Sequence, residues 1–143
     1  MILYLDTSAL VKLYADEPGS RLVREAVRSA QLGVCHLIAY AETRAALARK
    51  RRSGEFNGRQ WDACKRELER TWPRFERMGV DEALVRQAGN LADRFGLRGY
   101  DSVHLAAAET VFRVAGPSVE FRFAAFDDSL RRAATELGMV SLE

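Results

Sequence analysis

The stretch ILYLDTSALVKLY, residues 2–14, decides the fold class. Ile2–Leu5 is an uninterrupted apolar run of strand length, which is typical of a strand buried on both faces of a sheet. The run ends at Asp6, and Thr7 and Ser8 are residues that commonly cap a helix, so we expect a helix to begin here. A buried strand that leads directly into a helix is the pattern of an α/β fold.

The alternation of strand and helix continues to the end of the chain. Further short, mainly apolar runs predict strands at 33–37, 121–126 and 139–142, and residues 76–80 have a weak strand-like pattern. Helical spacing of apolar residues, with Gly and Pro at the boundaries, predicts helices at 20–30, 38–52, 57–73, 81–95, 100–115 and 129–137. This pattern predicts a three-layer α/β/α domain whose central, mainly parallel sheet has four or five strands. In such sheets, ligands bind beyond the carboxyl ends of the strands.

Length and composition limit the class of protein. The chain has 143 residues, 48% of them hydrophobic and 29% charged, which fits one globular domain and excludes a disordered chain. No apolar run approaches the roughly 20 residues of a membrane helix, and the first residues lack the basic segment of a secretory signal. Two cysteines are too few for a disulfide framework. We therefore expect a single cytoplasmic domain over residues 1–143, without a membrane partner.

Basic residues are concentrated in the middle of the chain. The segment from Arg44 to Arg77 holds 11 basic and 5 acidic residues, a net charge of +6, whereas the remaining residues carry −4. Such a segment on a mildly acidic body indicates an anionic partner, with nucleic acid as the first candidate. The simpler alternative is a solvated helical face. Within this region we expect residues 55–76 to form a basic helical insertion, or clip.

Four acidic residues stand where the local pattern calls for apolar ones. Asp6 and Asp127 each directly follow a predicted strand. Glu42 lies on the apolar stripe of its helix, and Asp101 begins the most apolar helix. Taken singly, each is explained as a helix cap, a strand end or a solvent-facing residue. A buried ionised carboxylate is costly unless it is paired or binds a cation, so the four acids together predict a shared function.

Convergence of these four carboxylates would require a cation. Mg²⁺ and Mn²⁺ prefer oxygen ligands, and Mg²⁺ usually completes its shell with water and substrate phosphate. The residues alone therefore predict a candidate acidic metal site at the sheet edge, beside a basic helix. Such a site would bind a phosphodiester and present it to a metal-activated water.

Smaller polar residues surround the predicted site. Thr7 and Ser8 are expected either to bind phosphate and hold Asp6 in place or only to cap the helix. Lys12 lies about one turn further along and faces either the site or the solvent. His104 stands in the most apolar helix, which is typical of a buried histidine with satisfied hydrogen bonds, and we place it outside the site.

Four segments of the chain resemble the motifs of one family, the PIN domains, and most closely those of VapC-type toxin ribonucleases. In order they are LDTSALVKLY at 5–14, AYAETRAAL at 39–47, LRGYDSVHLAAA at 97–108 and FAAFDDSLRRAATELGM at 123–139. Each motif alone is weakly specific, and the third is the most characteristic. All four in order, over nearly the whole chain, are strongly specific.

The resemblance implies a PIN-like fold and a metal-dependent endoribonuclease that is the toxin of a toxin–antitoxin module. The implied catalytic and metal-binding residues are Asp6, Glu42, Asp101 and Asp127, with Mg²⁺ or Mn²⁺ as cofactor. Metal-activated water would hydrolyse RNA to 5′-phosphate and 3′-hydroxyl ends. The implied protein partners are a VapB-type antitoxin and a second copy of the chain in a homodimer. The residues expected to bind RNA are Ser8, Thr7, Lys12, Arg49, Lys50, Arg51 and Arg52.

Two features leave alternatives open. Asp127 is followed by Asp128, and we favour Asp127 as the fourth acid because it directly follows the strand. Ala125 occupies a position where many relatives have Ser or Thr.

The competing functions are a phosphotransfer receiver domain and a non-catalytic RNA- or protein-binding module. A receiver requires paired acids after its first strand, whereas this chain has only Asp6 there.

Overall fold

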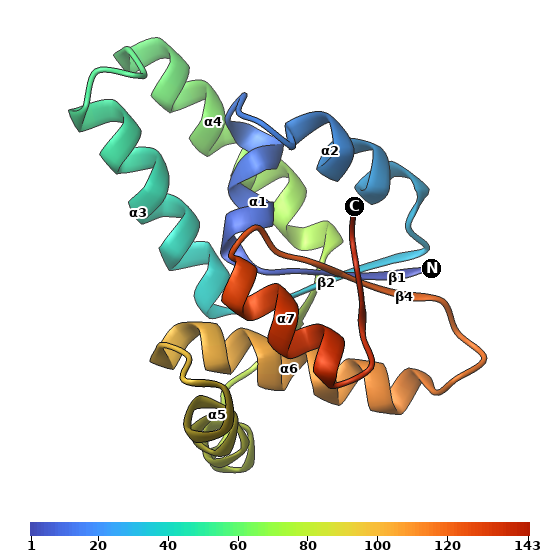
Figure 1. The fold of residues 1–143 in the computed structure, drawn as a ribbon. Coiled ribbons are helices and arrows are strands. Elements are labelled where there is room, and N and C mark those ends of the chain that lie inside the picture. The colour runs from blue at the N-terminus through green and yellow to red at the C-terminus, as the bar shows by residue number, and fades with distance from the viewer.

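The computed structural model describes residues 1–143 as a five-stranded sheet with helices on both faces (Figure 1). The strands are β1 (Ile2–Leu5), β2 (Leu32–His36), β3 (Glu76–Met78), β4 (Phe121–Ala124) and β5 (Val140–Ser141). The helices are α1 (Thr7–Tyr14), α2 (Ser20–Ser29), α3 (Ile38–Arg52), α4 (Gly58–Thr71), α5 (Glu82–Phe95), α6 (Gly99–Ala115) and α7 (Asp128–Glu136), with a 3₁₀ turn at Trp72–Arg74. None of these helices has both the length and the apolar character needed to cross a membrane.

The order of the strands creates a crevice beside β1. The sheet runs β3-β2-β1-β4-β5, and every strand pairing is parallel. The chain builds outward from β1 to β3 and then returns to place β4 on the other side of β1. Ligands bind where the strand order reverses in this way, beyond the carboxyl ends of the strands. The predicted α/β/α fold with a parallel sheet is confirmed.

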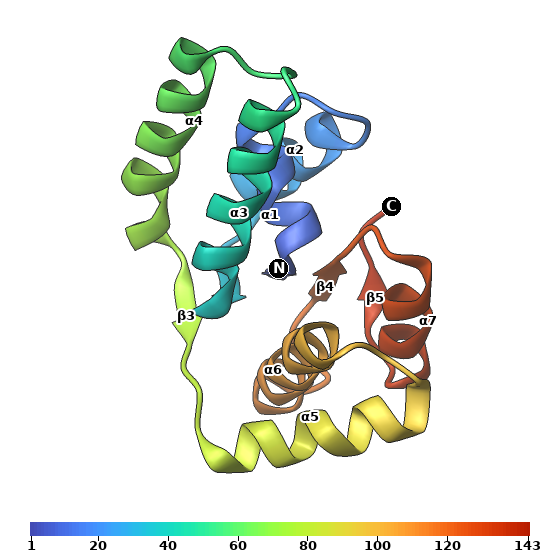
Figure 2. The ribbon, with the colours of Figure 1, turned by 90° about the vertical axis from the view of Figure 1, so that its left-hand side faces the viewer.

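The residues of β1 point alternately to two separate cores. Leu3 and Leu5 pack with α1 to α4, whereas Tyr4 packs with α5 to α7. Figure 2 shows these two groups of helices on opposite sides of the sheet. All three side chains are fully buried. Burial on both faces is the reason that β1 has an unbroken apolar sequence.

The start of α1 differs from the prediction. Asp6 is the capping residue, since its backbone is extended (φ −75°, ψ 177°) and its Oδ1 accepts a hydrogen bond from the Ala9 amide at 2.9 Å. Thr7 and Ser8 are already helical, so the prediction that they cap the helix is wrong. The cap comes one residue earlier because the strand turns into the helix at Asp6 itself. The hydroxyls of Thr7 and Ser8 are therefore used in other contacts.

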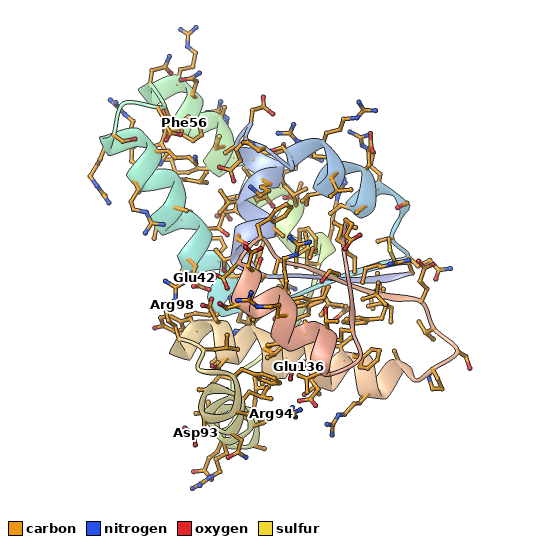
Figure 3. All side chains as sticks on the ribbon, in the orientation of Figure 1. Glu42, Phe56, Asp93, Arg94, Arg98 and Glu136 are labelled. Carbon is orange, nitrogen blue, oxygen red and sulfur yellow. The ribbon has the colours of Figure 1, made fainter.

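Helices α3 and α4 form a hairpin that projects away from the sheet (Figure 1). Phe56 lies near the tip of this hairpin (Figure 3). The side chain of Asn57 caps α4 in a reciprocal pair with Gln60. Residues 55–76, which we expected to be a basic insertion, comprise α4, its flanking turns and the start of β3. The last turn of α3 carries the basic run Arg49–Arg52.

The turn between α1 and α2 requires a glycine. Gly19 has a φ of +92°, and a Cβ at this position would meet the ring of Phe126 at 2.7 Å. We expect Gly19→Ala to lower the free energy of unfolding by about 2 kcal/mol, because backbone strain and the clash act together. Gly96→Ala is a matched control, since Gly96 has a φ of +65° but a Cβ there meets nothing within 4 Å. Urea unfolding measures both changes, and equal losses would contradict a role for the clash.

Candidate active site

An open cavity of about 610 Å³ lies beyond the carboxyl ends of β1 and β4. Its lining includes all four predicted acids, which come from four separate segments: Asp6, Glu42, Asp101 and Asp127. Of the residues expected to bind RNA, the lining includes Thr7, Ser8, Lys12, Arg49 and Lys50. Arg51 and Arg52 do not line the cavity, because successive residues of a helix point about 100° apart and these two are exposed on other faces of α3.

Asp6 is the most deeply buried of the four acids. Only 4% of the residue is exposed. Its Oδ1 accepts hydrogen bonds from Ser8 Oγ at 2.6 Å and from the Ala9 amide at 2.9 Å, whereas Oδ2 accepts none. Burial raises the pKa of Asp6 to about 6, and the nearby charge of Asp101 adds to the rise against the opposing effect of the two hydrogen bonds. A nearby cation would therefore stabilise the ionised form of this carboxylate.

Glu42 is held by a partly buried hydrogen-bond network that joins α3 to α1 and α6. Its Oε1 accepts hydrogen bonds from Thr7 Oγ1 and from His104 Nε2, both at 2.7 Å. A carboxylate only accepts, so Nε2 of His104 carries a proton, and the Tyr4 hydroxyl lies 3.3 Å from the other ring nitrogen. Burial opposes the ionisation of Glu42, but the hydrogen bonds from His104 and Thr7 outweigh it and lower the pKa. The network fixes Oε1 and leaves Oε2 without a hydrogen bond.

Asp101 and Asp127 lie at the starts of two helices. Asp101 is in the first turn of α6, where the helix dipole favours a carboxylate, and its Oδ2 accepts from Arg98 Nε at 3.1 Å. Figure 3 shows Arg98 close to Glu42, where α6 begins beside α3. Asp127 caps α7 by accepting a hydrogen bond from the Leu130 amide. The neighbouring Asp128 has a side chain that is 85% exposed and lies outside the cavity, so the structure places Asp127 and not Asp128 beside the other acids.

The donor chemistry of the cavity fits a hard divalent cation. Carboxylate and hydroxyl oxygens dominate the lining near Asp6, and these are the ligands that Mg²⁺ and Mn²⁺ prefer. In the present conformation no three of the acids lie close enough together to hold one ion. Each acid is instead engaged within the chain, through a helix cap, an arginine or the His104 network. These contacts leave one oxygen of each carboxylate without a hydrogen bond: Asp6 Oδ2, Glu42 Oε2, Asp101 Oδ1 and Asp127 Oδ2.

Two lysines on the cavity share one acid that the sequence analysis did not select. Glu17 accepts from Lys12 Nζ at 3.0 Å and lies 3.1 Å from Lys50 Nζ. Burial acts to raise the pKa of Glu17, and the hydrogen bonds from the two lysines lower it below its ordinary value. Lys12 also lies over the ring of Phe126, 4.4 Å from its centre. Lys12 therefore faces the site rather than the solvent.

His104 is the second residue of the site that the sequence analysis did not assign. It is buried, as predicted, with 1% exposure. The prediction that it lies outside the site is wrong, because its ring contacts Glu42 and lines the cavity. The sequence did contain one signal for His104: it lies three residues after Asp101, a spacing that puts both residues on one face of α6. Its partner Glu42 is 62 residues away and was not visible from that spacing.

Comparison with known proteins identifies the family to which this chain belongs. The model of the PIN domain matches residues 3–136. The chain belongs to the PIN domain family. Ribonuclease VapC46 of Mycobacterium tuberculosis (strain ATCC 25618 / H37Rv) is 34% identical over 137 residues, which are 96% of this chain and 93% of that relative. The resemblance drawn from the four motifs is therefore confirmed.

The fold of this PIN domain is also similar to solved structures. One is Mycobacterium tuberculosis VapC20, a Sarcin-Ricin loop cleaving toxin, with a TM-score of 0.66 and 18% identity over 92% of this chain and 94% of that one. Another is a toxin–antitoxin complex from Klebsiella pneumoniae, with a TM-score of 0.60 and 13% identity over 87% of this chain and 86% of that one. At these identities the likeness concerns the fold.

Proposed function

We propose that this PIN domain is the toxin of a toxin–antitoxin pair and an endoribonuclease whose active site is the acid-lined cavity. The observation that carries the proposal is the meeting of four acids from four segments on one cavity, in a chain 34% identical to Ribonuclease VapC46. The same fold occurs in a Sarcin-Ricin loop cleaving toxin and in a toxin–antitoxin complex. These likenesses support RNA as the substrate and an antitoxin as the partner.

The cavity's oxygen-rich lining supports a divalent metal as cofactor, with Mg²⁺ or Mn²⁺ as the candidates. Asp6 and Asp101 would be the main ligands, directly or through water. Glu42 and Asp127 would complete the shell, hold a second ion or orient the attacking water. When bound, the ion would lower the pKa of a water molecule and offset the charge that develops on the phosphate.

The chain's own residues hold the other participants in place. The contacts of Thr7 and His104 fix Oε1 of Glu42 and leave Oε2 free to hold an ion or a water molecule. Lys12 and Lys50 provide positive charge for the phosphates of RNA, in exchange for their present partners, which are Glu17 for both lysines and also Glu55 for Lys50. Attack by external water does not use the 2′-hydroxyl of RNA. With the P–O3′ bond broken and the 3′-oxygen as the leaving group, the products are a 5′-phosphate and a 3′-hydroxyl.

The chemistry of the cut ends tests this proposal. Purified protein, freed of any bound partner, is incubated with total cellular RNA, and the fragment ends are mapped by sequencing that requires either a 5′-phosphate or a 5′-hydroxyl. We expect fragments with 5′-phosphate and 3′-hydroxyl ends. Fragments that end in a 2′,3′-cyclic phosphate would contradict attack by water. No cleavage at all by folded protein would favour a non-catalytic binding module.

We expect the basic residues that line the cavity to bind substrate more strongly than the basic residues that lie outside it. Arg49 lines the cavity and forms no ion pair, whereas Arg52 lies outside it on the same helix. We expect Arg49→Gln to raise KM by about 5- to 10-fold and to reduce the slope of log binding against log salt by about 1, because one phosphate contact is lost. Arg52→Gln is the matched control and should change KM less than 2-fold. Equal effects of the two variants would contradict this assignment.

Two macromolecular partners complete the proposal. We place a VapB-type antitoxin over the cavity, and a second copy of the chain in a homodimer, both in the cytoplasm. Residues 55–76 would act as a basic clip within a single PIN domain. Light scattering of the purified protein tests the dimer, and a monomer at micromolar concentration would contradict it.

A further inference from the structure

A second open cleft adjoins the acid-lined cavity. It has a volume of about 780 Å³ and lies between α3, α5 and the start of α6. The two cavities share five lining residues: Glu42, Arg49, Arg98, Tyr100 and Asp101. Figure 3 shows Glu42 and Arg98 near each other at this junction. A polymeric ligand bound at the acids can therefore extend directly into the second cleft.

The floor of the second cleft is apolar and made of small residues. It is formed by Val85, Ala88, Gly89 and Ala92 of α5. Val85 is 47% exposed although it is apolar. A Cβ added at Gly89 would meet nothing within 4 Å, so the space above this residue is open. A flat apolar group of moderate size has room to lie on this surface.

Tyr100 stands at the boundary between the two cavities. It lines both of them and directly precedes Asp101. The residue is 60% exposed, and its hydroxyl forms no hydrogen bond within the chain. An aromatic side chain of this kind, beside a cavity that takes phosphate, is a typical platform for an unstacked base of single-stranded RNA. Arg49, which is free of ion pairs, supplies positive charge on the same boundary.

We propose that the second cleft binds the base of the nucleotide next to the scissile phosphate, with Tyr100 as its stacking platform. This inference rests on the proposed ribonuclease function. The continuity of the two cavities identifies the occupant, because a phosphate at Asp101 brings the neighbouring nucleotide to Tyr100 and the α5 floor. The cleft would then take part in selecting the RNA sequence that is cut.

Kinetics on a short RNA test this subsite. The substrate is a single-stranded 12-mer centred on a site that the wild type cuts in total RNA, and a second 12-mer lacks the base next to the cut bond. We expect Tyr100→Ala to raise KM by about 5- to 100-fold with kcat changed much less, because one stacking contact is lost. Tyr100→Phe and Tyr100→Trp should retain the wild-type KM within a few-fold. Removing the base should raise KM of the wild type similarly and add little in Tyr100→Ala.

Two further variants separate the cleft from a general effect on folding. Gly89→Leu places a side chain in the open space above the floor, and we expect it to raise KM as Tyr100→Ala does. Val114→Ala is the control on α6, the helix that also carries Tyr100, because Val114 is 84% exposed and lies outside both cavities. Its KM should equal that of the wild type.

Three results would overturn the inference. If the wild type cuts RNA and Tyr100→Ala cuts it equally well, the subsite is absent while the proposed function stands. If the losses from Tyr100→Ala and from the missing base are additive, the ring does not contact that base. If Gly89→Leu changes the oligomeric state in light scattering, the cleft is an interface between copies. Absence of cleavage by the wild type would instead remove the proposed function, and the subsite with it.

Discussion

Asp6→Asn is expected to abolish RNA cleavage and, at the same time, to raise the free energy of unfolding at pH 7.5 by about 1–3 kcal/mol. The carboxylate is buried, and burial raises its pKa from the ordinary 3.8 to about 6. Ionisation at neutral pH is therefore a cost to the folded state. Asparagine has the same shape and keeps an oxygen that can accept from Ser8 and Ala9, but it carries no charge.

The pH dependence of this gain has a defined sign. Between about pH 4 and pH 6 the folded wild type binds a proton that the unfolded chain has released, so its free energy of unfolding falls as the pH rises. The advantage of Asp6→Asn should be complete above about pH 6 and disappear below about pH 4. Urea unfolding at pH 3.5, 5 and 7.5 measures it. Asp128→Asn is the control, because that side chain is 85% exposed and outside the cavity.

Added Mg²⁺ should stabilise the wild type much more than Asp6→Asn. An ion that binds only the folded state raises the free energy of unfolding, and the gain grows with ion concentration. The wild type should gain stability between 0 and about 10 mM Mg²⁺, whereas Asp6→Asn should gain much less. A variant that is less stable than the wild type at pH 7.5, or that still cuts RNA, would contradict the role given to Asp6.

The second large effect is expected at His104. We expect His104→Leu to lower the free energy of unfolding by about 1–3 kcal/mol, because it leaves the hydroxyl of Tyr4 and Oε1 of Glu42 short of a partner at a buried position. We also expect kcat/KM to fall by about 10- to 100-fold, because Glu42 loses the hydrogen bond that orients it. His104 acts through Glu42 and is a positioning residue.

A graded series distinguishes orientation of Glu42 from a loss of packing. His104→Gln keeps an N–H donor for Glu42 and should recover part of the activity. Tyr4→Phe keeps the ring that stacks on Phe123 and removes only the hydroxyl, so it should leave more activity than His104→Leu. The Mg²⁺ concentration for half-maximal activity should rise in His104→Leu. If His104→Gln and His104→Leu lose stability and activity equally, the hydrogen bond to Glu42 is not the cause.

The fold was predictable because its three interior strands, β1, β2 and β4, are largely buried. Ile2–Leu5 and the other interior strands are then short, mainly apolar runs, and several helix ends have strong local signals, such as the N-cap Asp127 of α7 and the glycines Gly96 and Gly116 that follow α5 and α6. Asp81 and Asn57 cap the helices that the sequence predicted after them. The cap of α1 was assigned to Thr7 and Ser8 because three consecutive residues there are all good caps, and only the backbone direction after β1 selects Asp6.

The acids of the site were predictable for a different reason. Asp6, Glu42 and Asp101 conflict with the apolar pattern around them, and that conflict can be seen in the sequence alone. The contacts of Glu17 and His104 cannot be predicted from the sequence, because they depend on how α1, α3 and α6 meet in space. Glu17 pairs with both Lys12 and Lys50, which are 38 residues apart, and the local sequence does not indicate the contact between Glu17 and Lys50.

The measurement that tests the central claim most directly is cleavage of one mapped RNA oligonucleotide by wild type and by Asp101→Asn, with the metal removed and restored. The wild type should cut in Mg²⁺ or Mn²⁺, stop in EDTA and resume when the metal is added back, while folded Asp101→Asn should lose activity by at least about 100-fold under every condition. Equal cleavage in EDTA, or full activity in Asp101→Asn, would contradict a metal-dependent nuclease site at the acid-lined cavity.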